Sequence, residues 1–321
     1  MTLSEDLLND WSYDPVANET DEPLVQVFRA FERADPDGAR IARMMRQTLD
    51  QLYDGQRTGR FSWDQLHKTE RTHFGTLFEI NLRREFDDVI DEGVALDYRI
   101  AGHDVDCKFS QTMNAWMIPP EAVGELLFVG YVRDSTSEFA VGVVRASPEH
   151  LRSGANRDAK VGLNQAGRDA VRWLHRPGDL PPNVLLQADP DDLAAIFMKG
   201  LSGQARVNEL FRRIVRRRIG RNAVATVAQQ DDFMKRVREN GGARSLLRPE
   251  GYVILGGDYA LHRWVAAQLG VPVPEAGEMV SLRVTRADRG EVNAVEIADS
   301  WWRAANDGEH ISGPAPLVPH R

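Results

Sequence analysis

The stretch that most constrains the fold is LDYRIAGHDVDCKFS, residues 96–110, in which two alternating runs flank a turn. Successive side chains of a β-strand point to opposite faces, and cross-strand partners point to the same face. A tight turn at Gly102–His103 predicts three cross-strand pairs: Ile100 with Val105, Tyr98 with Cys107, and Asp97 with Lys108. One face of this hairpin is then apolar, and the other carries Asp97, Arg99, Asp106 and Lys108.

The polar face of the hairpin suggests a chemistry. Two carboxylates a few ångströms apart repel each other, and a divalent ion such as Mg²⁺ between them relieves the repulsion. Lys108 stands two residues from Asp106 and can hold a water molecule beside the metal, as phosphodiester hydrolysis requires. A face of this composition is also common on the solvated side of a sheet, so the hairpin alone leaves both interpretations open.

Length and composition bound the remaining possibilities. The 321 residues suit two domains, and 42% hydrophobic with 27% charged residues is typical of globular proteins. The acidic N-terminus has no apolar signal core, and no apolar run approaches the length of a membrane span. The single cysteine, Cys107, excludes an intramolecular disulfide, favours a cytoplasmic location, and is expected to be a small core residue.

The charge is distributed unevenly along the chain. The formal total is −8, but residues 199–248 contain thirteen Lys/Arg and four Asp/Glu, a local charge of +9 that leaves −17 for the rest. A basic segment in an acidic protein indicates contact with nucleic-acid phosphates, although an arginine-rich helix can also be simply a solvated face.

The pattern of helix, strand and turn signals divides the chain into four parts. These are a mobile acidic tail (1–20), a first domain (21–174), a linker rich in proline (175–183) and a second domain (184–321). In the first domain we expect helices near 23–34, 36–54 and 72–86, with Asp35 as the N-cap of the second. Two buried strands follow the hairpin, in GELLFVGYV and FAVGVVRA, and a helical region near 156–175 closes the domain.

The second domain has the element order of a winged helix-turn-helix. Apolar residues recur at helical spacing in RVNELFRRIVRRRIGR, and a short helix, NAVATVAQ, comes next. A break at Gln229–Gln230, a second helix from Asp231 to about Arg238, and a hairpin in GGARSLLRPEGYVILGG complete the order. Phosphate and base contacts are then expected from the following residues: Arg221, Gln229, Gln230, Asp231, Asp232, Lys235, Arg236, Arg244 and Arg248.

Long blocks of the sequence resemble the NaeI family of restriction endonucleases. The similarity runs from about residue 36 to the C-terminus and is carried by these stretches: TLDQLYDGQRTGRFSWDQLHKTERTHFGTLFEINLRREF, DYRIAGHDVDCKFS, GQARVNELFRR, ATVAQQDDFMKRV and GGARSLLRPEG.

The resemblance implies both a fold and an activity. The expected fold is an N-terminal α/β endonuclease domain of the PD-(D/E)xK class, a mixed sheet flanked by helices, joined to a C-terminal α+β winged helix-turn-helix domain related to the catabolite activator protein. The implied activity is Mg²⁺-dependent cleavage of double-stranded DNA at a GC-rich palindrome by a homodimer that must also bind a second, effector copy of its site. A cognate DNA methyltransferase would protect the host.

By resemblance, the metal-binding carboxylates fall on Asp97 and Asp106, the catalytic lysine on Lys108, and a further acidic site residue on Glu79. Glu79 would not be selected from its own pattern, since a glutamate in an amphipathic helix is usually solvated. The loop before Asp97, DDVIDEGVAL, is longer than in the family, so the spacing from Glu79 to Asp97 departs from the family pattern.

Two other functions remain open on the residues alone. One is a winged-helix regulator that binds DNA without cutting it. The other is an enzyme that breaks and rejoins DNA through a tyrosine such as Tyr53 or Tyr252, although neither has an evident Arg/His constellation around it.

Overall fold

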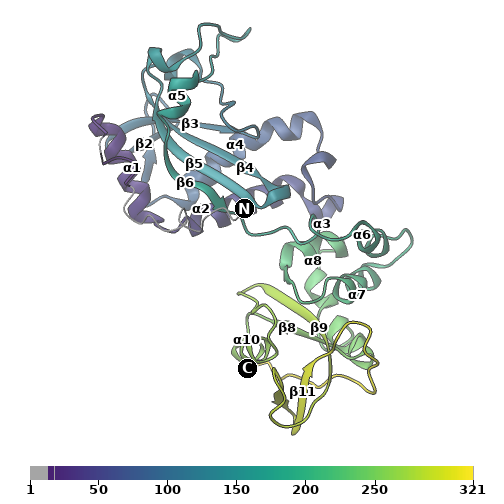
Figure 1. The fold of residues 1–321 in the computed structure, drawn as a ribbon. Helices are drawn as coiled ribbons and strands as arrows, with labels where there is room; N and C mark the ends of the chain where they lie inside the picture. Colours follow the sequence, from purple (N-terminus) through teal and green to yellow (C-terminus); the bar gives the residue numbers. More distant parts are fainter. Residues whose placement is uncertain (1–13, 18, 321) are drawn as a thin grey trace, which may run out of the picture. The chain divides into compact units, whose positions relative to one another are not determined.

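The structure, a computed structural model, describes residues 14–17 and 19–320. The chain forms two compact units (Figure 1). The first contains the described residues as far as Leu49 together with Lys68–Pro181, and the second contains Asp50–His67 and everything from Pro182 onward. No helix among the described residues has both the length and the apolar character needed to cross a bilayer.

The first unit is built on a six-stranded mixed sheet, as expected for an α/β domain. Its spatial order is β1 to β6, with β3 and β4 parallel and every other neighbouring pair antiparallel. The strands are β1 (Ile90–Glu92), β2 (Tyr98–Ile100), β3 (His103–Ser110), β4 (Leu126–Arg133), β5 (Glu138–Arg145) and β6 (Arg172–Asp179). The helices of this unit are α1 (Glu22–Ala34), α2 (Ala39–Tyr53, which ends beyond the unit boundary), α4 (Lys68–Glu85) and α5 (Gln165–Asp169).

Capping side chains explain where the first two helices begin. Asp21 accepts a hydrogen bond from the Leu24 N–H at the start of α1. Asp35 is buried, and its two carboxylate oxygens accept the N–H groups of Arg40 and Ile41, each at 2.9 Å. The predicted N-cap position is wrong, because α2 starts at Ala39 and Asp35 is instead the C-cap of α1, but the Asp35 side chain still caps the first turn of α2.

An aromatic core joins α4 to the strands that carry the candidate site. The rings of Phe74 and Phe109 lie 4.4 Å apart between centroids, and those of Phe78 and Phe109 lie 5.3 Å apart. A Cβ atom at Gly130 of β4 would lie 2.5 Å from the Phe78 ring. Glycine at this position therefore lets α4 approach the sheet closely.

The opposite face of the sheet is covered by irregular segments. Trp116 and Ile118 are fully buried against Leu127 and Val129 of β4. Because both faces are covered, β4 and β5 read as continuous apolar runs, as the sequence predicted.

Three expectations for the first unit need correction. The helical region near 156–175 is only α5, because the backbone at Val161 and Leu163 forms bridges with Ile118 and Leu151. The segment expected to be a linker, 175–183, begins as part of β6, an edge strand that accommodates its proline. Of the predicted tail, residues 1–13 and 18 lie outside the described residues.

The described part of that tail is packed and not loose. Val16 is buried, and Glu19 forms an ion pair with Arg172 at 2.7 Å. Asp14 also pairs with Arg29 of α1.

The second unit contains a five-stranded antiparallel sheet and short helices. Its strand order is β10-β11-β9-β7, with β8 also paired to β9. The strands are β7 (Arg218–Gly220), β8 (Tyr252–Gly256), β9 (Glu278–Arg286), β10 (Val295–Ile297) and β11 (Ser300–Ala304). The helices are α3 (Gly55–Thr58), α6 (Pro190–Ile196), α7 (Gly203–Arg213), α8 (Arg221–Ala228), α9 (Ala243–Leu246) and α10 (Ala260–Gln268).

The segment Asp50–His67 packs within the second unit, although the sequence assigned it to the first domain. Gly55 of α3 lies so close to Thr226 of α8 that a Cβ atom would come within 2.1 Å of the threonine hydroxyl. The Phe61 ring stacks on Phe197 at 5.6 Å. These contacts join residues far apart in the sequence, which is why periodicity did not reveal them.

The second helix of the expected helix-turn-helix is not an α-helix. Residues Phe233–Arg236 form only a 3₁₀ turn after α8 ends at Ala228. Asp231, the expected N-cap, instead accepts a hydrogen bond from Gln56 at 3.1 Å. The segment expected to be the hairpin forms α9, a 3₁₀ turn and the single strand β8, which pairs with β9. The winged helix-turn-helix is therefore not confirmed.

A buried histidine couples α10 to the C-terminal segment. His262 is 1% exposed, its Nδ1 accepts the Gly256 N–H at 3.0 Å, and its Nε2 lies 3.1 Å from the Val318 carbonyl. The neutral ring satisfies both contacts, since one nitrogen accepts and the other donates. Burial, with the nearby charges of Arg244 and His320, lowers the pKa of His262 to about 4.

We expect this histidine to make the second unit sensitive to acid. Its pKa in the folded state lies below the unfolded value of about 6.5, so its contribution is complete above pH 6.5 and is lost as the pH falls towards 4. A shift of this size corresponds to roughly 3 kcal/mol. Denaturant unfolding at pH 7 and pH 4.5 should show a smaller loss of stability for His262→Gln than for the unsubstituted protein. His310 is exposed, so His310→Gln should lose as much stability as the unsubstituted protein. An equal loss of stability in all three proteins would contradict the role assigned to His262.

Candidate active site

The hairpin of β2 and β3 forms, but its register differs from the prediction by two residues. Tyr98 pairs with Val105, Arg99 with Asp104 and Ile100 with His103. The turn is Ala101–Gly102, with φ angles of 51° and 86°, a two-residue connection with positive φ at both central positions. A shift of two residues preserves which side chains share a face, so the predicted separation into apolar and polar faces survives.

The apolar face of the hairpin is buried as expected. Tyr98, Ile100 and Val105 are at most 1% exposed, and Cys107 is 7% exposed. Burial raises the pKa of the Cys107 thiol. This agrees with a core residue and not with a nucleophile, which must ionise readily.

The polar face brings together the three residues that the sequence singled out. The Lys108 Nζ lies 2.6 Å from Asp106 Oδ2 and 3.8 Å from Asp97 Oδ2. Asp97 stands directly before β2, and its Oδ2 accepts the Cys107 N–H at 2.8 Å. This bond fixes Asp97 beside Cys107 of β3, whereas the predicted cross-strand partner of Asp97 was Lys108.

Burial and charge oppose each other at Asp106. The side chain is almost fully buried, and burial raises the pKa of Asp106 to about 6 against the opposing effect of the Lys108 ammonium. The negative charge of Asp97 also favours the protonated form. A positive charge beyond that of Lys108 would relieve this cost.

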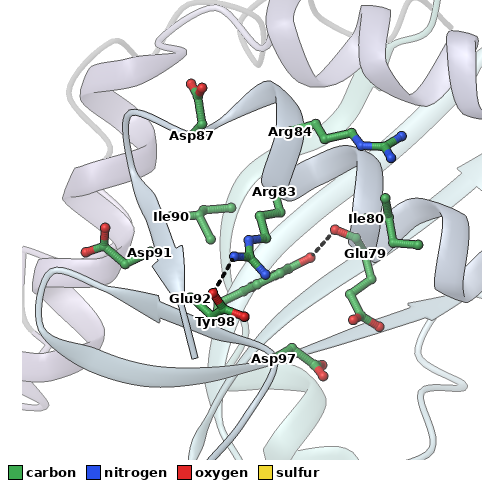
Figure 2. Close-up of a pocket in the computed structure, with 10 residues that line it drawn as sticks. All are labelled: Glu79, Ile80, Arg83, Arg84, Asp87, Ile90, Asp91, Glu92, Asp97 and Tyr98. Atoms are coloured by element: carbon green, nitrogen blue, oxygen red, sulfur yellow. Dashed lines mark hydrogen bonds and ion pairs between the residues drawn. The ribbon is translucent and has the colours of Figure 1, made fainter. Parts of the chain in front are cut away.

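Glu79 reaches the same place from α4. It lines a pocket of about 640 Å³ together with Asp97 and Tyr98, and Figure 2 shows the carboxylates of Glu79 and Asp97 at one end of it. Burial is the main cause that raises the pKa of Glu79, and the charge of Asp97 adds to it while Lys108 opposes it. The remaining residues that line the pocket are Ile80, Arg83, Arg84, Asp87, Ile90, Asp91 and Glu92.

The carboxylates of Glu79, Asp97 and Asp106 suit a hard divalent cation, which prefers carboxylate oxygens as ligands. Asp106 Oδ2 is buried and receives no correctly directed hydrogen bond, although the Lys108 ammonium lies against it. In this arrangement the Lys108 ammonium serves as the counter-ion of the Asp106 carboxylate. Within the described part of the chain no three His, Cys, Asp or Glu side chains are gathered closely enough to hold an ion, so binding requires Glu79 or Lys108 to adjust.

Most of the residues that were expected to contact DNA instead form hydrogen bonds and ion pairs with other residues of the second unit. Arg221 pairs with Asp258 at 2.8 Å. Gln230 accepts a hydrogen bond from Arg236 at 2.7 Å, and Asp232 pairs with Arg236 at 3.0 Å.

The remaining members of this set differ in exposure. Gln229 lies near Gly59 and 3.5 Å from Arg206, and Arg244 donates to the Ile254 carbonyl at 3.1 Å. Arg248 begins a 3₁₀ turn and is half-buried. Lys235 has 59% of its side chain exposed and makes only a 3.5 Å ion pair with Asp232.

Comparison with known proteins identifies the family of this chain. The family model described as "Restriction endonuclease NaeI" matches residues 25–313. The type II restriction enzyme NaeI of Lentzea aerocolonigenes is 49% identical over 310 residues, which cover 94% of this chain and 96% of that protein. The chain therefore belongs to the NaeI family and is a type II restriction endonuclease, a site-specific deoxyribonuclease.

Proposed function

We propose that this endonuclease hydrolyses both strands of a GC-rich palindromic DNA site with Mg²⁺ held by Asp97 and Asp106. Glu79 completes the acidic site, and Lys108 acts on the attacking water. The observation that carries the proposal is the convergence of Asp97, Asp106 and Lys108, with both carboxylates within 3.8 Å of one ammonium group.

The protein's own side chains account for much of the reaction. When bound, Mg²⁺ would supply a Lewis acid for the scissile phosphate and lower the pKa of a water molecule. Asp97 is held in place by the Cys107 N–H, and Asp106 by its burial in β3, so both carboxylates are oriented before DNA arrives. Lys108 can donate to the attacking oxygen and stabilise the negative charge that develops on the phosphate.

The second unit is proposed to bind DNA, with its basic segment 199–248 contacting phosphates. The 3₁₀ turn Phe233–Arg236 replaces the recognition helix, so base reading by Gln229, Gln230, Asp231 and Asp232 requires their internal contacts to open. Lys235, Arg248 and Arg221 are the more accessible phosphate contacts of the proposed set, and Arg244 is largely enclosed.

The proposal also includes a homodimer, which suits a two-fold symmetric site. A second DNA copy would activate cleavage, and a cognate methyltransferase would protect the host DNA in the cytoplasm. These features come with the family resemblance. A covalent mechanism through Tyr53 or Tyr252 is not favoured, because Tyr53 is 1% exposed and the Tyr252 hydroxyl donates to the Arg212 carbonyl.

We expect Lys108→Ala to reduce the cleavage rate roughly 10²–10³-fold, the usual cost of removing one group that stabilises developing charge. Plasmid cleavage in Mg²⁺ measures the rate, and a gel-shift assay without metal should show that DNA binding is retained. Lys160→Ala removes an exposed lysine from the same unit and should leave the rate unchanged. Cleavage by Lys108→Ala at the unsubstituted rate would reject the assigned role.

Lys235→Gln should weaken DNA binding at all sequences and flatten its salt dependence. Each lost phosphate contact reduces the slope of log K against log salt by about 1. Fluorescence anisotropy in EDTA, over a range of NaCl concentrations, measures the slope without cleavage. Arg289→Gln alters an exposed cation outside the basic segment and serves as the control. Equal slopes for both variants and the unsubstituted protein would remove Lys235 from the DNA interface.

The proposed target predicts the products of digestion. Sequenced ends of digested genomic DNA should share one GC-rich palindrome, and a short duplex carrying that palindrome should accelerate cleavage of a plasmid with a single copy. Ends without a common sequence would contradict the palindromic target. If the added duplex left the cleavage rate unchanged, only the proposed effector activation would be contradicted, and the palindromic target would stand.

A further inference from the structure

The acidic groups of the site come from separate parts of the first unit. Glu79 lies on α4, Asp97 stands in the loop before β2, and Asp106 lies on β3. Carboxylates repel one another, and movement of a few tenths of an ångström changes the fit of an ion that demands near-ideal geometry. The structure therefore needs a contact that sets α4 against the hairpin near Glu79.

Tyr98 provides such a contact. It follows Asp97 in the chain and is 1% exposed, and its hydroxyl donates a hydrogen bond of 2.7 Å to the backbone carbonyl of Glu79. Figure 2 shows this bond crossing from the hairpin to α4 beside the Glu79 and Asp97 carboxylates. One side chain thus joins the helix turn that carries Glu79 to the strand that begins directly after Asp97.

We propose that Tyr98 is a positioning residue that holds the turn of α4 carrying Glu79 beside the hairpin, so that the Glu79 side chain can reach a divalent cation shared with Asp97. This inference rests on the proposed metal-dependent function. Because Tyr98 itself is only 1% exposed, we assign it no contact with DNA or the scissile phosphate. Its hydroxyl bond resists the outward movement that like charges on Glu79 and Asp97 would otherwise cause before the cation binds.

The geometry separates this role from general stability. In an α-helix the Glu79 carbonyl also accepts the N–H four residues later, so removal of the tyrosine hydroxyl leaves it a partner. The phenylalanine ring retains the burial of Tyr98. Tyr98→Phe should therefore fold and chiefly loosen the relation between α4 and the hairpin.

Isothermal titration of Mg²⁺ into the full-length protein without DNA tests the proposal. We expect Tyr98→Phe to raise the Kd for Mg²⁺ roughly fivefold, the factor expected for the loss of one hydrogen bond. Cleavage should require a correspondingly higher Mg²⁺ concentration, with kcat at saturating Mg²⁺ close to that of the unsubstituted protein. A role limited to stability would lower the melting temperature and leave the Kd unchanged.

Tyr131→Phe is the matched control. Tyr131 is buried in β4 of the same sheet, and its hydroxyl forms no hydrogen bond with any residue that the structure describes. This variant should bind Mg²⁺ like the unsubstituted protein. A Kd unchanged by Tyr98→Phe, or one raised equally by both phenylalanine variants, would overturn the proposal.

A double-substitution cycle tests whether Tyr98 acts through Glu79. In a Glu79→Gln background the repulsion from Asp97 is absent, so Tyr98→Phe should produce no further change in the Kd. A fivefold increase that persists in this background would overturn the proposal. If the unsubstituted protein bound no Mg²⁺, the proposed metal-dependent function would fail first. If it bound Mg²⁺ and Asp106→Asn abolished that binding, the function would stand whatever Tyr98→Phe does.

Discussion

The mutual repulsion of carboxylates around one lysine is the constraint on which the site depends. Asp106 is almost fully buried, with the Lys108 ammonium 2.6 Å away, and the Asp97 carboxylate lies 3.8 Å from the same ammonium. One positive charge cannot balance two buried or half-buried carboxylates and Glu79 nearby. The fold thus maintains an excess of negative charge at a fixed place, which a divalent cation would neutralise. Under the proposed function, that place is where the scissile phosphate would be attacked.

The surrounding packing makes this arrangement possible. The Phe78 ring and Gly130 let α4 approach the sheet, and the Tyr98 hydroxyl reaches the Glu79 carbonyl across the same interface. Core packing and site geometry are therefore linked at α4, so we expect substitutions at Phe78 to disturb the site without touching DNA.

The sequence predicted the hairpin, its two faces and the convergence of Asp97, Asp106 and Lys108, because a period of two determines which side chains share a face. It failed on register, since Ala101 adopts a positive φ that residue type did not indicate. The sequence-based prediction also failed where contacts between distant residues determine the local structure. The segment 50–67 joins the second unit through contacts such as Phe61 with Phe197, and the expected recognition helix is a 3₁₀ turn. Glu79 was found only through family resemblance, because its helical pattern resembles that of a solvated residue.

The most direct test of the central claim is the position of a divalent ion in crystals grown with Mn²⁺, located by anomalous scattering. The account predicts an ion about 2–2.5 Å from carboxylate oxygens of both Asp97 and Asp106, with the Lys108 ammonium displaced from Asp106. An ion bound away from both aspartates, or an undisturbed contact between Lys108 and Asp106 in saturating metal, would contradict it.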